Sequence, residues 1–171
     1  FINLIGEKFS GKTHLANIFI QKFKGIKINS SEINNQFLKE IKLYENIVVE
    51  DLDRQVDENL FFTLLNIIDQ DNKYLIVTTT IPIVDFSYKL NDLNSRSKSF
   101  LLSSIEKPED DLMFALILKN LSDRQISIDK KLIDFIIKRI DRSYEKISRF
   151  ISTLDKYSLK KGSPFTLKLI K

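Results

Sequence analysis

The sequence predicts an α/β domain with a parallel β-sheet covered by helices on both faces, followed by a small all-helical domain. Two observations support this fold class. Through residue 105, short apolar segments alternate with segments whose apolar residues recur at helical spacing, which is typical of a three-layer α/β arrangement. From residue 106 onward the apolar pattern is helical throughout, and no segment resembles a buried strand. We therefore expect two domains, at 1–105 and 106–171.

The strands expected in the first domain are short apolar or β-branched runs, at residues 1–5, 25–28, 47–49, 74–77 and 99–105. Helical spacing of apolar residues predicts the helices between them, at 11–23, 30–41, 58–69 and 90–97. Ser30 and Ser31 are N-cap candidates for the second of these helices, because a serine hydroxyl can accept a hydrogen bond from a backbone N–H.

The second domain is expected to contain three main helices. Pro108 takes the first position of the first helix, where its missing N–H does no harm. Asp129 caps the second helix, which runs to about residue 140. The third covers 143–159 and ends before Gly162, and a last short piece is expected at residues 165–170.

Composition excludes several classes of protein. Of the 171 residues, 43% are hydrophobic, yet no apolar run approaches the roughly 18 residues that a membrane helix needs. The chain has no cysteine and a single histidine, His14, which excludes disulfides, argues against a zinc site and suits a cytoplasmic protein. Phe1 falls inside an expected strand without a preceding initiator Met or signal peptide, so we expect N-terminal residues to be missing.

Positive charge is concentrated in the last third of the chain. Residues 106–171 contain 15 Lys or Arg against 10 Asp or Glu, whereas the remainder contains 12 against 13. Two interpretations are open: the solvated faces of amphipathic helices, or a surface that contacts nucleic acid or an acidic partner.

The strongest motif is the loop from Gly6 to Thr13, which matches GxxxxGK[ST] between an apolar strand and a helix. In such a loop, backbone N–H groups at the helix N-terminus point at phosphate oxygens, Lys12 adds a mobile positive charge, and the Thr13 hydroxyl can ligate Mg²⁺. We therefore predict that ATP or ADP binds through the loop and the start of its helix: Gly6, Glu7, Phe9, Ser10, Gly11, Lys12, Thr13 and His14.

Two residues of this set are unusual. Phe9 stands where many such loops have glycine, so we expect it to narrow or reshape the phosphate site. His14 follows the motif on the helix, and we interpret it as a packing or polar contact rather than as a catalytic base.

A pair of acids follows the third expected strand. Glu50 and Asp51 end the run Ile47-Val48-Val49, where a buried strand delivers acids beside a phosphate loop. Glu50 would hold Mg²⁺ through water, and Asp51 would orient or deprotonate the attacking water. The usual order of these acids is Asp then Glu. Because the exchange shifts each carboxylate by one methylene, we expect slow hydrolysis.

Three further polar residues are candidates for the same site. Thr80 ends the strand after the acid pair, where its hydroxyl can reach the γ-phosphate or the attacking water. Arg96 follows a short helix, and a fixed guanidinium there can stabilise charge on a phosphate held by a neighbouring subunit. Arg142 begins the long helix of the second domain and could bind the nucleotide, as could Arg139 or Arg149.

With these elements in order, the sequence resembles the AAA+ ATPases, and within them the DnaA group of replication initiators. The stretch Gly6–Leu15 is similar to the DnaA-type Walker A motif with its GKTHL ending, and Glu58–Asn66 resembles the phenylalanine-rich helix of that group. The resemblance places Thr80 at sensor 1, Arg96 in the arginine-finger motif, and Arg142 at or near sensor 2 in a helical lid, which would be the second domain.

Within that group the chain is most similar to the DnaA-related regulators of the Hda type, particularly alphaproteobacterial ones. The similarity lies in Val49–Arg54, in Arg139–Tyr144, and in Leu154-Asp155 before Gly162-Ser163-Pro164. It implies a protein that binds ADP or ATP, associates with the DNA polymerase sliding clamp and promotes hydrolysis of DnaA-bound ATP, with Arg96 acting in trans. The nucleotide at Lys12 would then be a switch, and negative regulation of replication initiation the outcome.

The partners implied by the resemblance are DnaA, the clamp and, indirectly, DNA, while self-association is possible and no membrane is expected. The clamp-binding motif of the group precedes the first strand, so that partner rests on the resemblance alone. Two alternatives stay open. One is a truncated DnaA initiator or a helicase-loader relative that acts on DNA, and the other is a small-molecule kinase with the same phosphate loop.

Overall fold

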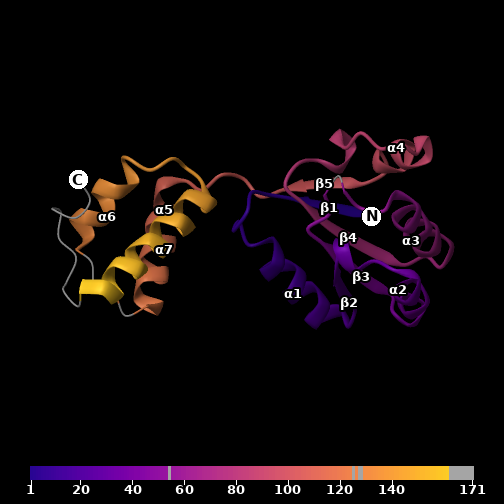
Figure 1. The fold of residues 1–171 in the computed structure, drawn as a ribbon, viewed down its shortest axis with the longest axis horizontal. Helices are drawn as coiled ribbons and strands as arrows, with labels where there is room; N and C mark the ends of the chain where they lie inside the picture. Colours follow the sequence, from indigo (N-terminus) through magenta and orange to yellow (C-terminus); the bar gives the residue numbers. More distant parts are fainter. Residues whose placement is uncertain (54, 125, 127–128, 162–171) are drawn as a thin grey trace. The chain divides into compact units, whose positions relative to one another are not determined.

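The computed structural model describes residues 1–53, 55–124, 126 and 129–161 (Figure 1). By its internal contacts the chain divides into two compact units. Unit 1 contains Phe1–Gly6 and Gly11–Ile105, and unit 2 contains Glu7–Ser10 together with the residues from Glu106 onward. The short segment Glu7–Ser10 therefore packs with the helical unit although it lies between two parts of unit 1 in sequence.

Unit 1 is built on a five-stranded sheet in the order β2-β3-β4-β1-β5, and every strand pair is parallel. Its strands are β1 (Ile2–Ile5), β2 (Ile26–Asn29), β3 (Asn46–Glu50), β4 (Tyr74–Thr79) and β5 (Leu101–Ser104). Ile5 pairs with Thr79 on one side and with Ser104 on the other. The segment that follows β1 and the acids Glu50 and Asp51 at the end of β3 therefore lie at the same edge of the sheet, where ligands of such folds bind.

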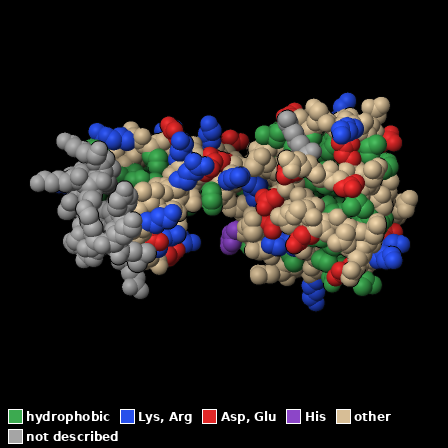
Figure 2. Space-filling model, viewed as in Figure 1, with side chains coloured by type: hydrophobic (Ala, Val, Ile, Leu, Met, Phe, Trp, Pro, Cys, Tyr) green, Lys and Arg blue, Asp and Glu red, His purple; other side chains and the backbone are tan. Residues whose placement is uncertain are grey.

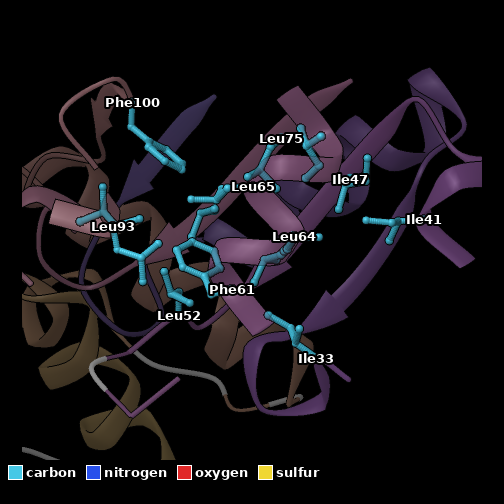
Figure 3. Packing of buried hydrophobic residues seen from close by; sticks show 14 of the residues in the cluster. Ile33, Ile41, Ile47, Leu52, Phe61, Leu64, Leu65, Leu75, Leu93 and Phe100 are labelled. Carbon is cyan, nitrogen blue, oxygen red and sulfur yellow. The ribbon is translucent and has the colours of Figure 1, made fainter. Parts of the chain in front are cut away.

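Helices cover the two faces of this sheet unequally. Unit 1 contains α1 (Lys12–Phe23), α2 (Asn35–Glu40), α3 (Glu58–Gln70) and α4 (Asn91–Ser97). In Figure 1, α1 lies on one side of the sheet, and α2 and α3 lie on the other. The second side holds the main core, where Phe61, Leu64 and Leu65 of α3 pack against Ile47 and Leu75 of the sheet (Figure 3). Burial of this apolar surface is the main force that holds α3 in place.

The expectation of full coverage on both faces is wrong at β5. All four residues of this edge strand are exposed, and they include Leu101 and Leu102. On α1, the apolar pattern residues Leu15, Ile18 and Phe23 are exposed as well. The side chains that α1 buries are Lys12 and Ala16. Periodicity alone thus identified the helix correctly but not the side of it that is buried.

The predicted cap of α2 is also wrong. Ser30 and Ser31 belong to a short 3₁₀ turn, Ser30–Glu32, that follows β2. Asn34 caps α2 instead, because its side-chain oxygen accepts hydrogen bonds from the backbone N–H groups of Gln36 and Phe37 at 2.9 and 3.0 Å. Asparagine is as good an N-cap residue as serine, so residue preference alone could not decide between the two positions.

Unit 2 consists of α5 (Asp110–Asp123), α6 (Lys130–Ile137) and α7 (Tyr144–Lys161). Asp129 caps α6 as predicted, with its carboxylate accepting from the N–H of Lys131 at 3.3 Å. Pro108 does not begin α5, whose N-cap is Glu109. The piece predicted at 165–170 and Gly162 lie outside the described residues. The helices share one apolar core, formed by Met113, Ile117, Leu121, Leu132, Ile133, Ile136, Ile147, Ile151 and Leu154.

Four basic side chains of unit 2 form ion pairs in the part of it that the structure describes: Arg124, Arg142, Lys146 and Arg149. On the face shown in Figure 2, Lys and Arg side chains alternate with acidic ones. Arg124 pairs with Asp155, and Arg149 pairs with Glu145. These pairs favour the solvated-face interpretation of the basic excess over a continuous basic surface.

Across the described part of the chain, no helix combines the length and apolar composition needed to cross a bilayer.

Candidate nucleotide-binding site

The turn that joins β1 to α1 has the features of a phosphate-binding loop. Gly11 has a φ of 96°, a left-handed conformation that glycine adopts without strain. The Lys12 ammonium folds back and donates to the carbonyl oxygen of Gly6 at 2.7 Å. Within the described residues, the N-terminus of α1 has neither a side-chain cap nor an acid in its first turn. Its partial positive charge is therefore available to an anion.

Phe9 has a left-handed backbone conformation, which favours glycine. Its φ is 67°, in the left-handed region, and the residue is 66% exposed. A residue with a Cβ is strained there, by about 1–2 kcal/mol. The expected narrowing or reshaping of the phosphate site by Phe9 stays a prediction.

Ser10 and Glu7 contribute to the loop in different ways. The Ser10 hydroxyl is buried and has no hydrogen-bond partner in the described structure, so a phosphate oxygen or a water molecule would satisfy it. The Glu7 carboxylate accepts hydrogen bonds from the Ser143 hydroxyl and from the Tyr144 N–H, the latter at 2.9 Å. Burial, and secondarily the Glu7 charge, raises the pKa of Tyr144. The Glu7 side chain thus holds the start of α7.

Glu50 and Asp51 differ sharply in environment. The Glu50 side chain is only 12% exposed, and its Oε2 lies 2.7 Å from the Lys27 ammonium of the neighbouring strand. Its Oε1 is buried without a hydrogen-bond partner among the described residues. Asp51 is exposed and has a φ of 51°. This left-handed backbone is held by two hydrogen bonds, from the Asp51 N–H to Thr78 Oγ1 and from Ser30 Oγ to the Asp51 carbonyl.

The threonines that end β4 are not equivalent. Thr78 accepts from Asp51 as described, and the Thr79 hydroxyl accepts from Asn3 Nδ2 at 2.8 Å. Both threonines are buried, while Thr80, the residue that the sequence favoured, is exposed just beyond the strand. The structure thus leaves Thr80 as the hydroxyl that a ligand at this edge could reach.

Sequence reasoning missed Asn3, which is fully buried in β1. Its amide nitrogen donates to Thr79 Oγ1 and to the carbonyl of Val77, and its oxygen accepts from the N–H of Ile83 at 2.8 Å. These bonds tie β1 to the end of β4 and to the turn after it. The sequence signal that could have identified Asn3 is a polar residue in the middle of an apolar strand, because buried amides need partners.

Arg96 is held by α3 and is not fully solvated. Its guanidinium lies 3.5 Å from the Asp69 carboxylate and 5.7 Å from the centre of the Phe62 ring. The side chain is 30% exposed. A planar cation on an aromatic face, next to a carboxylate, has fewer accessible rotamers than a free arginine.

The three arginines proposed for sensor 2 all lie in unit 2. Arg142 Nε pairs with Asp110 at 3.0 Å, Arg139 stacks on the ring of Phe135, and Arg149 pairs with Glu145. Arg142 lies just before the residues of α7 that Glu7 holds. The contacts within unit 2 do not distinguish one of the three as a nucleotide ligand.

The residues proposed for Mg²⁺ fit a metal held mainly by phosphates and water. The buried, unpartnered Glu50 Oε1 can accept a hydrogen bond from a metal-bound water molecule, and the Thr13 side chain is exposed at the start of α1. Within the described residues, no group of three or more His, Cys, Asp or Glu side chains is placed to hold a metal ion.

No known family profile matches this sequence. The fold is similar to that of domain III of the replication initiation protein DnaA from Thermotoga maritima, with a TM-score of 0.74 and 18% identity over 98% of this chain and 80% of that one. It is also similar to AMPPCP-bound DnaA from Aquifex aeolicus, with a TM-score of 0.70 and 20% identity over 94% of this chain and 56% of that one.

A RuvB variant from Thermotoga maritima matches with a TM-score of 0.74 and 14% identity, over 99% of this chain and 59% of that one. The chain thus spans little more than half the length of the Aquifex DnaA chain. At these identities the likeness shows the fold. The predicted fold class is confirmed, because the five-stranded parallel sheet with its helices is that of the AAA+ proteins DnaA and RuvB.

Proposed function

We propose that this chain binds ADP or ATP at the loop Gly6–Thr13 and regulates the initiation of DNA replication in the manner of the Hda group. The observation that carries the proposal is the loop itself. Gly11 is left-handed, Lys12 is turned back onto Gly6, and the α1 N-terminus lacks a side-chain cap in the described structure. The likeness to AMPPCP-bound DnaA supports a nucleotide as the anion.

The roles proposed for the individual residues follow from their positions. Backbone N–H groups of the loop and the Lys12 ammonium bind the phosphates. Thr80 contacts the terminal phosphate or the attacking water, and Asp51 orients that water. Mg²⁺, when bound, would be held by Thr13 and, through water, by Glu50, and would neutralise phosphate charge. Arg142 is the proposed nucleotide contact of the helical unit.

Arg96 is the residue proposed to act on a partner's nucleotide. Asp69 and Phe62 restrict its guanidinium, so less conformational entropy is lost when it meets a phosphate. We infer that the partner is a DnaA molecule carrying ATP and that the sliding clamp brings the two together. The support for these two partners is the sequence resemblance, while the fold is similar to those of both DnaA and RuvB.

The experiment that tests this function follows ATP hydrolysis by DnaA in the presence of the full-length protein, clamp and DNA. An arginine finger contributes about 10³-fold or more to hydrolysis, so Arg96→Ala should abolish the stimulation. Lys98→Ala removes a neighbouring exposed cation and should leave it intact. Absence of stimulation by the wild-type protein, or full stimulation by Arg96→Ala, contradicts the proposed regulation.

A DNA-acting ATPase of the initiator or helicase-loader type is the second candidate. One structure with a similar fold is a replication initiator DnaA bound to AMPPCP and single-stranded DNA, with a TM-score of 0.70 and 20% identity. This candidate predicts that single-stranded DNA alone stimulates ATP hydrolysis by the chain, whereas the regulatory function predicts stimulation only when DnaA is present.

A further inference from the structure

Lys27 lies in β2, outside every motif of the nucleotide site, yet its ammonium reaches one of the proposed site residues. Its Nζ lies 2.7 Å from Glu50 Oε2 and donates to Asn17 Oδ1 at 2.8 Å. Asn17 belongs to α1, the helix that the phosphate-binding loop begins. One ammonium therefore joins the helix of the loop to the acid at the end of β3.

The strand register explains why Lys27 can reach Glu50. In the β2–β3 pair, Lys27 is opposite Val48, and Asn29 is opposite Glu50. Val48 and Glu50 point to the same face of β3 because side chains alternate along a strand. Lys27 therefore lies on the same face as Glu50, two positions back, and its long side chain spans the diagonal. Asn29 is not available to Glu50, since its side chain caps the following turn.

The pair is well shielded from water on the acidic side. The Glu50 side chain is 12% exposed and that of Lys27 is 30% exposed. A positive charge this close to a mostly buried carboxylate offsets its charge more strongly than it would at a solvated surface. The same contact fixes the carboxylate, with Oε2 turned to Lys27 and Oε1 left without a partner in the described structure.

We propose that Lys27 is a positioning residue that holds and neutralises Glu50, so that nucleotide binding by this chain depends only weakly on Mg²⁺. The inference rests on the proposed nucleotide site. Without Lys27, an uncompensated Glu50 carboxylate at the phosphate edge would repel the nucleotide, and a divalent cation would be needed to offset it. With Lys27 present, the protein supplies that positive charge itself.

The test measures the dissociation constant of a fluorescent ADP analogue in EDTA and in Mg²⁺, at matched ionic strength because salt screens charge. For the wild-type chain the two constants should agree within a factor of about three, as expected when the acid is already compensated. Lys27→Met should weaken binding in EDTA on the order of tenfold, because the uncompensated Glu50 carboxylate then repels the phosphates. Mg²⁺ should restore most of that loss.

Three further variants separate positioning from simple structural support. Lys27→Arg keeps the charge and should behave as the wild type. Adding Glu50→Gln to Lys27→Met removes both charges and should return the Mg²⁺ dependence toward the wild-type value, and the non-additivity of the two changes measures their direct interaction. Lys39→Met, an exposed lysine of α2, is the matched control and should change nothing. Thermal unfolding of each variant checks the fold, and Lys27→Gln replaces Lys27→Met if the latter is unstable.

The outcomes distinguish the two proposals. If the wild-type chain binds ADP but Lys27→Met shows the same ratio of constants as the wild type, the role of Lys27 is wrong and the nucleotide site stands. The inference is also overturned if the wild-type dissociation constants in EDTA and in Mg²⁺ differ by far more than the expected factor. If the wild-type chain binds no ADP in either condition, the proposed function fails and the inference fails with it.

Discussion

Phe9 offers a quantitative test of how the phosphate-binding loop is built. Its φ of 67° should cost a residue with a Cβ about 1–2 kcal/mol relative to glycine. Glycine loses roughly 0.5–1 kcal/mol more conformational entropy on folding than other residues. The net advantage of glycine at this position is then about 0–1.5 kcal/mol, with a centre of about 0.75 kcal/mol. Phe9→Gly should therefore be more stable than Phe9→Ala. Both variants lack the exposed ring, so its loss does not affect the difference between them.

An alanine-to-glycine change at a helical position is the control, and it should change the stability in the opposite direction. Ala115 is exposed in the middle of α5, where the backbone is helical. There Ala115→Gly should destabilise the protein by about 1 kcal/mol. The assay is urea unfolding followed by circular dichroism, with the midpoints and slopes of all variants compared. The contradicting result is that Phe9→Gly is less stable than Phe9→Ala, by the same amount that Ala115→Gly loses relative to the wild type. Residue 9 would then not have a left-handed backbone.

Two further predictions concern unit 1. The backbone N–H groups of Lys89 and Leu90 bind the Glu58 carboxylate and lower its pKa from 4.5. The stability that this contact provides is present above pH 4.5 and is lost as the pH falls through the lowered pKa. The stability difference between the wild type and Glu58→Gln should therefore shrink on acidification. A difference in unfolding midpoint that stays constant with pH contradicts this prediction. At Gly25, an added Cβ would lie 2.2 Å from the Asn46 carbonyl oxygen, so Gly25→Ala should destabilise the protein by about 1–3 kcal/mol; an unchanged melting temperature would contradict the close approach of β2 and β3.

Sequence patterns predicted the elements of this fold well because each strand is a short apolar run and each helix has a clear period. The strand expected at 47–49 is β3 (Asn46–Glu50), and the helix expected at 58–69 is α3 (Glu58–Gln70). The glycine-loop motif could be found in the sequence because it needs only neighbouring residues.

The contacts that organise the site could not be read in this way because they join residues far apart in the chain. Asn3 bonds to Thr79, and Lys27 bonds to Glu50, through strand pairings that no local pattern specifies. The conformation of Phe9 was missed for a different reason. Its side chain disfavours a left-handed backbone, and the loop as a whole overrides that preference.

Nucleotide binding at the loop is the central claim, and equilibrium binding of ADP to the purified chain measures it most directly. Lys12→Ala removes an ammonium whose hydrogen bonds to phosphate should contribute about 1.5–3 kcal/mol each. We predict at least about a tenfold loss of affinity for Lys12→Ala. Lys22→Ala, at the exposed far end of α1, should bind ADP as the wild type does. Equal affinity of Lys12→Ala and the wild type, or no binding by either, would contradict the nucleotide site.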